Sequence, residues 1–303
     1  MVLSMIMLSS RYGLPFSTPS PNGAAFVGLH YLYPLLGVFV WFGFAALGQR
    51  QKIPFTFLVA LPCYSLVLIV HFNLKLWAHH INSHSYDLVY WKFDTFFRPV
   101  IDFCFILRRS LDPIIPLGSN FYLIGFMAMF YISFCYHSVV TRDKFRELFL
   151  AALIFQGLGG LAYLIFPAFG PFIYEAGVEP LSTHAQQAML QVHLQSMAGG
   201  AAWISAHGPT QFTLGLAAMP SLHSGGAFLF FLFAWRNGRV LVPLYSLILA
   251  FILINAVASR WHYLIDLPAG IALGWISLWL GQKFANQALD KAVPWTWGQF
   301  ART

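Results

Sequence analysis

The chain has 303 residues, of which 58% are hydrophobic and only 9% are charged, and its formal net charge at pH 7 is +7. This composition lies outside the range of soluble domains and predicts an integral membrane protein. Cytoplasmic Lys and Arg anchors explain the positive charge, so we expect no nucleic-acid partner.

Residues 1–118 are predicted to form an N-terminal transmembrane pair followed by an interfacial segment. The first residues lack a basic region and a clear cleavage site, so we expect no removable signal peptide. Runs of about 20 apolar residues predict spanning helices at Ala25–Leu47 and Pro54–Ala78. The stretch SYDLVYWKFDTFFRPVIDF then mixes aromatic and charged residues, which is typical of helices lying in the membrane interface.

Residues 119–303 are predicted to form a second unit with five more spanning helices, at Asn120–Val140, Glu147–Pro167, His223–Trp235, Val240–Val257 and Tyr263–Lys283. The third of these is short. Between the second and third lies a long segment, 168–222, whose only charged residues are Glu175 and Glu179. Its length and apolar content predict a packed cap on the outer face. The expected fold class is therefore all-α: a polytopic membrane protein with about six or seven transmembrane helices and interfacial helices outside.

Basic residues cluster at four places, which are Arg50 with Lys52, the stretch Arg142 to Arg146, Arg236 with Arg239, and the C-terminal group Lys283, Lys291 and Arg302. All four fall on one side if seven helices alternate, and that side is then cytoplasmic. The N-terminus, the interfacial segment and the cap are expected on the outer side. The three cysteines, Cys63, Cys104 and Cys135, are scattered and suggest neither a metal site nor a disulfide framework.

The stretch MPSLHSGG introduces an apolar run on this outer side. We expect Pro220 at the first position of a helix, whose free N–H groups and dipole favour a bound anion. Ser221 adds a hydroxyl donor. His223 adds an imidazole that can give or take a proton near neutral pH.

The stretch SRWHYLIDLPAG lies at the outer start of the last predicted helix. His262 and Asp266 are four residues apart, so on a helix they share a face and the carboxylate can hold one imidazole nitrogen. Arg260 supplies a forked cation suited to phosphate oxygens. Either histidine alone is more simply an interfacial residue, but ionisable groups are costly in a membrane protein, and the ordered pair with Asp266 favours chemistry.

These blocks resemble the signature of the type-2 phosphatidic acid phosphatase superfamily, which is Lys-x6-Arg-Pro, then Pro-Ser-Gly-His, then Ser-Arg-x5-His-x3-Asp. The second block matches Pro220, Ser221 and His223, with Leu222 in the glycine position, and the third matches at its histidine and aspartate. The first block is missing, since FPAFGP stands in its place, and Arg260 is not at the family arginine's spacing. Leu222, PAFGP and HYLID together resemble the branch of aureobasidin-sensitive inositol phosphorylceramide synthases and their bacterial relatives.

The resemblance implies a residue set for phosphoryl transfer on lipids at the extracytoplasmic leaflet. His262 would attack phosphorus to form a phosphohistidine, Asp266 would orient it, and His223 would protonate the leaving alkoxide and later deprotonate the acceptor. Ser221 and Arg260 would bind the phosphate, and no metal or cofactor is implied. A lipid phosphotransferase is favoured, since Leu222 and the uncharged cap suggest a water-poor cavity. A lipid phosphate phosphatase that uses water is the alternative. A transporter is disfavoured, because the charged residues lie at helix ends.

The expected partners are lipid substrates and the membrane, with the oligomeric state left open. Other outer cations are suited either to a lipid phosphate or to anchoring on anionic head groups: Lys92, Arg98, Arg108 and Arg109. Asp87 and Asp94 share a helical face and are expected to cap the helix or to pair with Lys92 and Arg98. Several outer histidines have no carboxylate or cysteine at ligand spacing, so polar interfacial roles are favoured over a metal site: His79, His80 and His84. Three more are candidates for substrate contact: His184, His193 and His207.

Overall fold

The computed structural model describes residues 2–20, 55–114, 118–214 and 218–290. In these ranges the secondary structure is helical throughout, with no β-strand. The expected all-α class is therefore confirmed for the described part of the chain. The predicted span Ala25–Leu47 lies outside the described residues.

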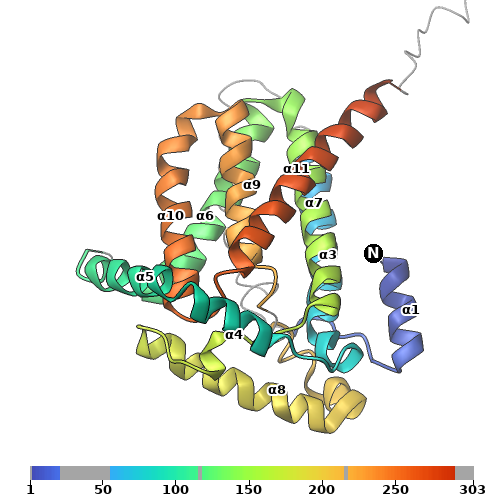
Figure 1. The fold of residues 1–303 in the computed structure, drawn as a ribbon. Coiled ribbons are helices and arrows are strands. Elements are labelled where there is room, and N and C mark those ends of the chain that lie inside the picture. Colours follow the sequence, from blue (N-terminus) through green and yellow to red (C-terminus); the bar gives the residue numbers. More distant parts are fainter. Residues whose placement is uncertain (1, 21–54, 115–117, 215–217, 291–303) are drawn as a thin grey trace, which may run out of the picture.

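Six long helices stand side by side as a bundle (Figure 1), and they are α3 (Phe55–Ile81), α6 (Gly118–Val139), α7 (Arg142–Ile165), α9 (Leu222–Asn237), α10 (Val242–Ala258) and α11 (Asp266–Asp290). Helix α11 packs against α7 and α9, while α3 packs against α7 and α10 against α9. The six correspond to the second to seventh predicted spans. Helix α7 begins at Arg142, so the basic residues expected in a loop belong to its first turns.

Three stretches in the described residues are long and apolar enough to cross a membrane: Phe121–Val139, Arg142–Ile165 and Arg239–Ala258. The last includes the short helix η3 (Arg239–Leu241) ahead of α10. Helix α9 has only 16 residues, in line with the short span that the sequence indicates. A membrane protein is thus supported, while the number of six or seven spans stays a prediction.

Three further helices lie across one end of the bundle (Figure 1), namely α4 (Asp87–Phe96), α5 (Arg98–Leu111) and α8 (Pro180–His207). Helix α8 has a kink at Gly200 and forms most of segment 168–222, together with the short helix η2 (Pro171–Ile173). On α5, Val100, Phe103 and Ile106 are exposed at helical spacing, as expected of a helix with one face toward lipid. The N-terminal helix α1 (Val2–Tyr12) packs against α3.

The starts of α9 and α11 lie at the same end of the bundle as α4, α5 and α8 (Figure 1). At the other end are the α6–α7 and α9–α10 connections. The motifs MPSLHSGG and SRWHYLIDLPAG therefore meet beneath the transverse helices, where the cap was expected.

Candidate active site

His262 lies in the turn between α10 and α11, and its backbone N–H donates to the Ala256 carbonyl. Its Nδ1 atom is 2.8 Å from the carbonyl oxygen of Ala218 and 3.3 Å from Oδ2 of Asp266. A carbonyl and a carboxylate only accept hydrogen bonds, so Nδ1 carries the ring proton. Nε2 can then keep a lone pair for attack on an electrophile.

Asp266 is fully buried and is the first residue of α11. Its Oδ2 atom accepts the N–H of Tyr263 at 2.8 Å in addition to the His262 proton. The expected pairing with His262 is present, but the idea that both residues share one helical face is wrong, because His262 precedes the helix. The negative charge of the carboxylate stabilises the N-terminus of α11, where the helix dipole is positive. The same carboxylate fixes the orientation of the His262 imidazole.

His223 is the second residue of α9, and its ring faces two aromatic side chains of α6. The ring centroids are 5.0 Å from Tyr122 and 4.9 Å from Phe126. Pro220 is not at the first helical position as expected. Helix α9 begins at Leu222, and Ser221 has extended backbone angles because its N–H donates to the Asp266 carbonyl at 3.0 Å.

Glycines allow the starts of α9 and α11 to touch through their backbones. A Cβ atom on Gly270 would lie 2.1 Å from the Ser221 carbonyl oxygen, and one on Gly225 would lie 2.3 Å from the Gly270 carbonyl oxygen. No side chain fits at either distance, so only glycine permits this approach. The contact brings the segments carrying His223 and His262 to one place.

Both histidines line a cavity of about 460 Å³. Its wall continues between α3 and α6, where it is mostly aromatic and aliphatic, with Tyr64, Leu68, Phe72, Tyr122, Phe126, Met127 and Phe130. Phe169, Met189 and Trp261 line it from the side of the transverse helices and loops. The cavity thus combines two imidazoles with walls suited to an apolar chain.

Ser221 and Arg260 are not among the residues that line this cavity. Ser221 is fully buried, and its hydroxyl donates to Oγ of Ser224 at 2.9 Å. Arg260 is fully buried, with Nη2 donating to Asp94 Oδ2 at 2.9 Å and Nε 3.5 Å from Glu175 Oε2. The geometry gives both side chains protein partners, so their expected contacts with phosphate stay predictions.

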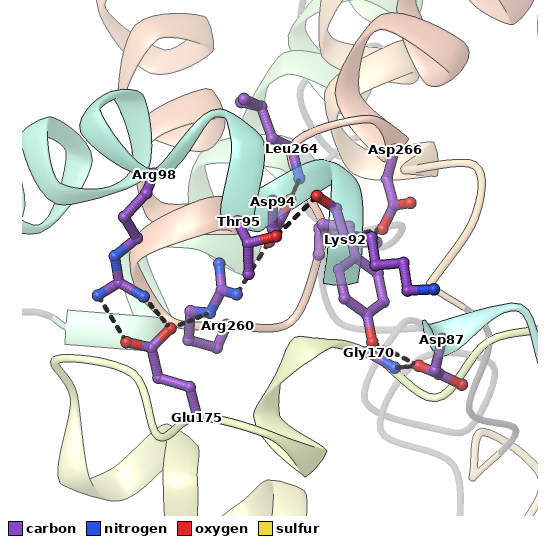
Figure 2. A network of polar contacts seen from close by, with 12 residues as sticks. Asp87, Lys92, Asp94, Thr95, Arg98, Gly170, Glu175, Arg260, Leu264 and Asp266 are labelled. Atoms are coloured by element: carbon purple, nitrogen blue, oxygen red, sulfur yellow. Dashed lines mark hydrogen bonds and ion pairs between the residues drawn. The ribbon is translucent and has the colours of Figure 1, made fainter. Parts of the chain in front are cut away.

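Asp94 of α4 holds the turn that carries His262 (Figure 2). One carboxylate oxygen accepts from the Arg260 guanidinium and the other accepts the N–H of Leu264 at 2.9 Å. Arg260 has a positive φ of 58°, which is a strained conformation for a residue with a side chain. Asp94 therefore binds on both sides of His262 and holds this strained turn in place.

Asp87, about two helical turns before Asp94 on α4, holds a second loop at the cavity. Its carboxylate accepts the Tyr263 hydroxyl at 2.7 Å and the N–H groups of Phe169 and Gly170, each at 2.9 Å (Figure 2). Phe169 itself lines the cavity. The expected pairing of Asp87 and Asp94 with Lys92 and Arg98 is wrong, because both carboxylates are used to fix loops of the site.

The two glutamates of segment 168–222 tie it to α5. Glu175 accepts two hydrogen bonds from Arg98, at 2.9 and 2.8 Å. Glu179 accepts from the fully buried Arg108, which also donates to Asn255 at 2.9 Å. These two arginines thus have structural partners. The other two outer cations of interest, Lys92 and Arg109, are exposed.

His79 and His193 are buried against each other, with ring centroids 4.9 Å apart. Burial, together with the nearby His79 and His80, lowers the pKa of His193 to about 3, so its ring is neutral at physiological pH. In the described part of the chain, no group of three or more His, Cys, Asp or Glu side chains is arranged to hold a metal ion. The remaining outer histidines, His84, His184 and His207, are exposed.

One cavity residue has no counterpart among the sequence candidates. Lys75 of α3 lines the cavity, with Nζ 5.7 Å from the centroid of the Tyr163 ring. The signal was present in the sequence, because Lys75 is a charged residue inside the predicted span Pro54–Ala78. Ionisable residues within spanning segments are rare and usually functional.

The family model described as PAP2 superfamily matches residues 117–280, which is just over half of the chain. The match covers all helices from α6 to α10 and α11 as far as residue 280, and so includes His223, His262 and Asp266. No curated protein and no solved structure matches the chain.

Proposed function

We propose that this chain, which belongs to the PAP2 superfamily, is an integral membrane lipid phosphotransferase that moves a phosphorylated head group between lipids. Superfamily members are generally phosphatases or phosphotransferases acting on phosphorylated lipids. The observation that carries the proposal is the shared cavity, in which His223 and His262 face a space with mostly apolar walls. Two imidazoles supply a nucleophile and an acid, and the walls supply room for a lipid chain.

The first half of the reaction uses the fixed orientation of His262. With its proton held on Nδ1 by Ala218 and Asp266, Nε2 attacks phosphorus and forms an N–P bond. The P–O bond to the donor lipid breaks, and protonated His223 gives its proton to the departing alkoxide. Asp266 balances the positive charge that develops on the His262 ring.

The second half transfers the phosphorylated head group to an acceptor. His223, now neutral, takes the proton from an acceptor hydroxyl, whose oxygen attacks phosphorus. The N–P bond breaks and His262 returns to its starting state. If the acceptor is a lipid alcohol, the product is a new phosphorylated lipid; if it is water, the reaction is hydrolysis.

Features of the cavity wall favour a lipid acceptor. Leu222 is buried and lines the cavity, and Phe169, Met189 and Trp261 cover it from the transverse side. A covered apolar site disfavours water as the acceptor. Leu222, PAFGP and HYLID also support likeness to inositol phosphorylceramide synthases, so we propose that branch. A lipid phosphate phosphatase is the alternative.

The domain division and membrane orientation belong to the same proposal. Residues 119–303 form the catalytic, phosphatase-like bundle with 168–222 as its outer cap, and residues 1–118 add the transmembrane pair and interfacial segment. The active site then faces the extracytoplasmic side, because Arg142 and Arg239 begin elements at the opposite end of the bundle.

The test uses purified protein in vesicles with phospholipids radiolabelled in the head group, namely phosphatidylinositol, phosphatidylcholine and phosphatidylethanolamine, with ceramide or diacylglycerol as acceptor. We expect a labelled lipid product from the wild type and none from His262→Ala. Because His223 acts as acid and base, His223→Gln should lower turnover by roughly 10²- to 10⁴-fold. His84→Gln, at an exposed histidine between α3 and α4, is the matched control and should stay active.

Two results would change the proposal. Release of a free phosphorylated head group or phosphate alone, whichever alcohol is supplied, would select the phosphatase alternative. Unchanged lipid turnover by His262→Ala would exclude both enzymatic assignments for this cavity.

A further inference from the structure

The catalytic cavity holds a lysine that belongs to neither histidine motif. Tyr64, Leu68, His71 and Lys75 recur at three- and four-residue intervals along α3 and all line the cavity. Lys75 is at the end of this face nearest the transverse helices. It lines the same cavity as His223 and His262.

Lys75 differs from the neighbouring arginines because no carboxylate pairs with it in the described part of the chain. The neighbouring arginines already pair with carboxylates: Arg98 with Glu175 and Asp102, Arg108 with Glu179 and Asp112, and Arg260 with Asp94. No Asp or Glu is among the described residues that line the cavity. Within the described ranges, no salt bridge to Lys75 is found either.

A cation facing an apolar cavity without an anionic partner is costly. The ring of Tyr163 offsets only part of that cost, because a cation–π contact is weaker than pairing with a full negative charge. A phosphate group that enters the cavity would supply the missing negative charge. Its charge is spread over several oxygens during transfer, and a lysine ammonium can follow these oxygens as a compact point charge.

We propose that Lys75 binds the phosphate group of the substrate beside His223 and His262. The inference rests on the proposed function, because it assigns a further residue to that same site. It places the cation on α3, outside residues 117–280 that match the family model. Arg260, the cation expected from the sequence, donates to Asp94 and is not among the residues that line the cavity.

Lys75→Met removes the charge and keeps most of the side-chain volume. We expect the KM for the lipid donor, and the inhibition constant of inorganic phosphate, to rise by about 10- to 100-fold, since hydrogen bonds to charged groups contribute about 1.5 to 3 kcal/mol. Lys75→Arg should recover most of the phosphate affinity. Lys283→Met, which removes an exposed lysine of α11, is the matched control and should leave both constants unchanged.

A measurement on the wild-type protein does not depend on activity or on the folding of a variant. Acetic anhydride acetylates accessible lysines, and mass spectrometry reports the rate at Lys75 and Lys283. Inorganic phosphate should slow the reaction at Lys75 and leave Lys283 unaffected. An unaltered rate at Lys75 at phosphate concentrations that inhibit turnover would overturn the inference.

The outcomes separate the two proposals. If the wild type transfers or hydrolyses phospholipid head groups, and Lys75→Met folds with unchanged constants, the Lys75 assignment is wrong and the proposed function stands. If no phosphorylated lipid is turned over, the proposed function fails. Phosphate protection of Lys75 would in that case still support an anion site at this residue.

Discussion

Asp94 contributes to the site through the turn that it holds. Its side chain is 1% exposed and pairs with Arg260, whose side chain is 0% exposed. It also accepts the Leu264 N–H, so it binds the backbone just beyond His262. Because Arg260 has a positive φ, loss of this carboxylate releases a strained turn as well as a buried charge.

Asp94→Asn should therefore lower stability and turnover together. Removal of one partner of a buried ion pair costs about 3 to 5 kcal/mol, and we expect a clearly lower midpoint of thermal unfolding in detergent. The matched control is Asp102→Asn on α5, where the carboxylate is 50% exposed and pairs with Arg98. Such surface pairs contribute about 1 kcal/mol or less. Equal midpoints for both variants would show that Asp94 does not hold the turn.

Helices α9 and α11 make their functionally important contact at their first turns. Gly225 and Gly270 allow backbone contact there, and the Ser221 N–H donates to the Asp266 carbonyl. The segment just ahead of α9 thus lies against the first turn of α11. This contact between the two motifs, rather than the spacing within either one, brings the two imidazoles to the same cavity.

Gly270→Ala should separate the two motifs. The new Cβ atom would lie 2.1 Å from the Ser221 carbonyl oxygen, so α9 must move by about 1 Å or more. A displacement of that size in a catalytic site can lower turnover by about 10²-fold. The steady-state lipid transfer assay measures this loss. Ala272→Leu, on the exposed side of α11, adds more volume and should leave turnover near the wild-type value; a similar loss there would argue against the close contact.

At the scale of the described molecule, the transverse helices and the starts of α9 and α11 lie at one end of the bundle, and the α6–α7 and α9–α10 connections lie at the other (Figure 1). Arg142, Arg236 and Arg239 belong to that opposite end. From the positive-inside rule we predict that the opposite end lies in the cytoplasm and the cavity on the extracytoplasmic side.

Cysteine labelling tests this orientation. In a chain with Cys63, Cys104 and Cys135 replaced by alanine, His184→Cys on α8 and Asp143→Cys on α7 each introduce one exposed thiol. A membrane-impermeant maleimide added to intact cells, or to sealed vesicles with a known orientation, should label position 184 from the extracytoplasmic side. Position 143 should react only after permeabilisation. The reverse pattern would place the active site in the cytoplasm.

The sequence predicts much of the architecture because apolar runs and short spacings are local properties. Six predicted spans correspond to helices, and the pairing of His262 with Asp266 follows from residues four positions apart. The positions of the motif residues relative to the helix starts differ from the prediction. His262 lies in a turn ahead of α11, and α9 begins at Leu222 rather than at Pro220. Hydrogen bonds between the two motifs cause these shifts, and spacing within one motif does not reveal them.

By itself, the sequence determined that this is a helical membrane protein with the histidine and aspartate pattern of the PAP2 superfamily. Only the tertiary structure decided which charges face the cavity. Arg260 is bound by a carboxylate 166 positions away in the chain, whereas Lys75, on a helix that packs against α7, lines the same cavity as the two histidines. The physical reason is that the electrostatic environment of a side chain depends on neighbours brought together by folding, and these can come from any part of the chain.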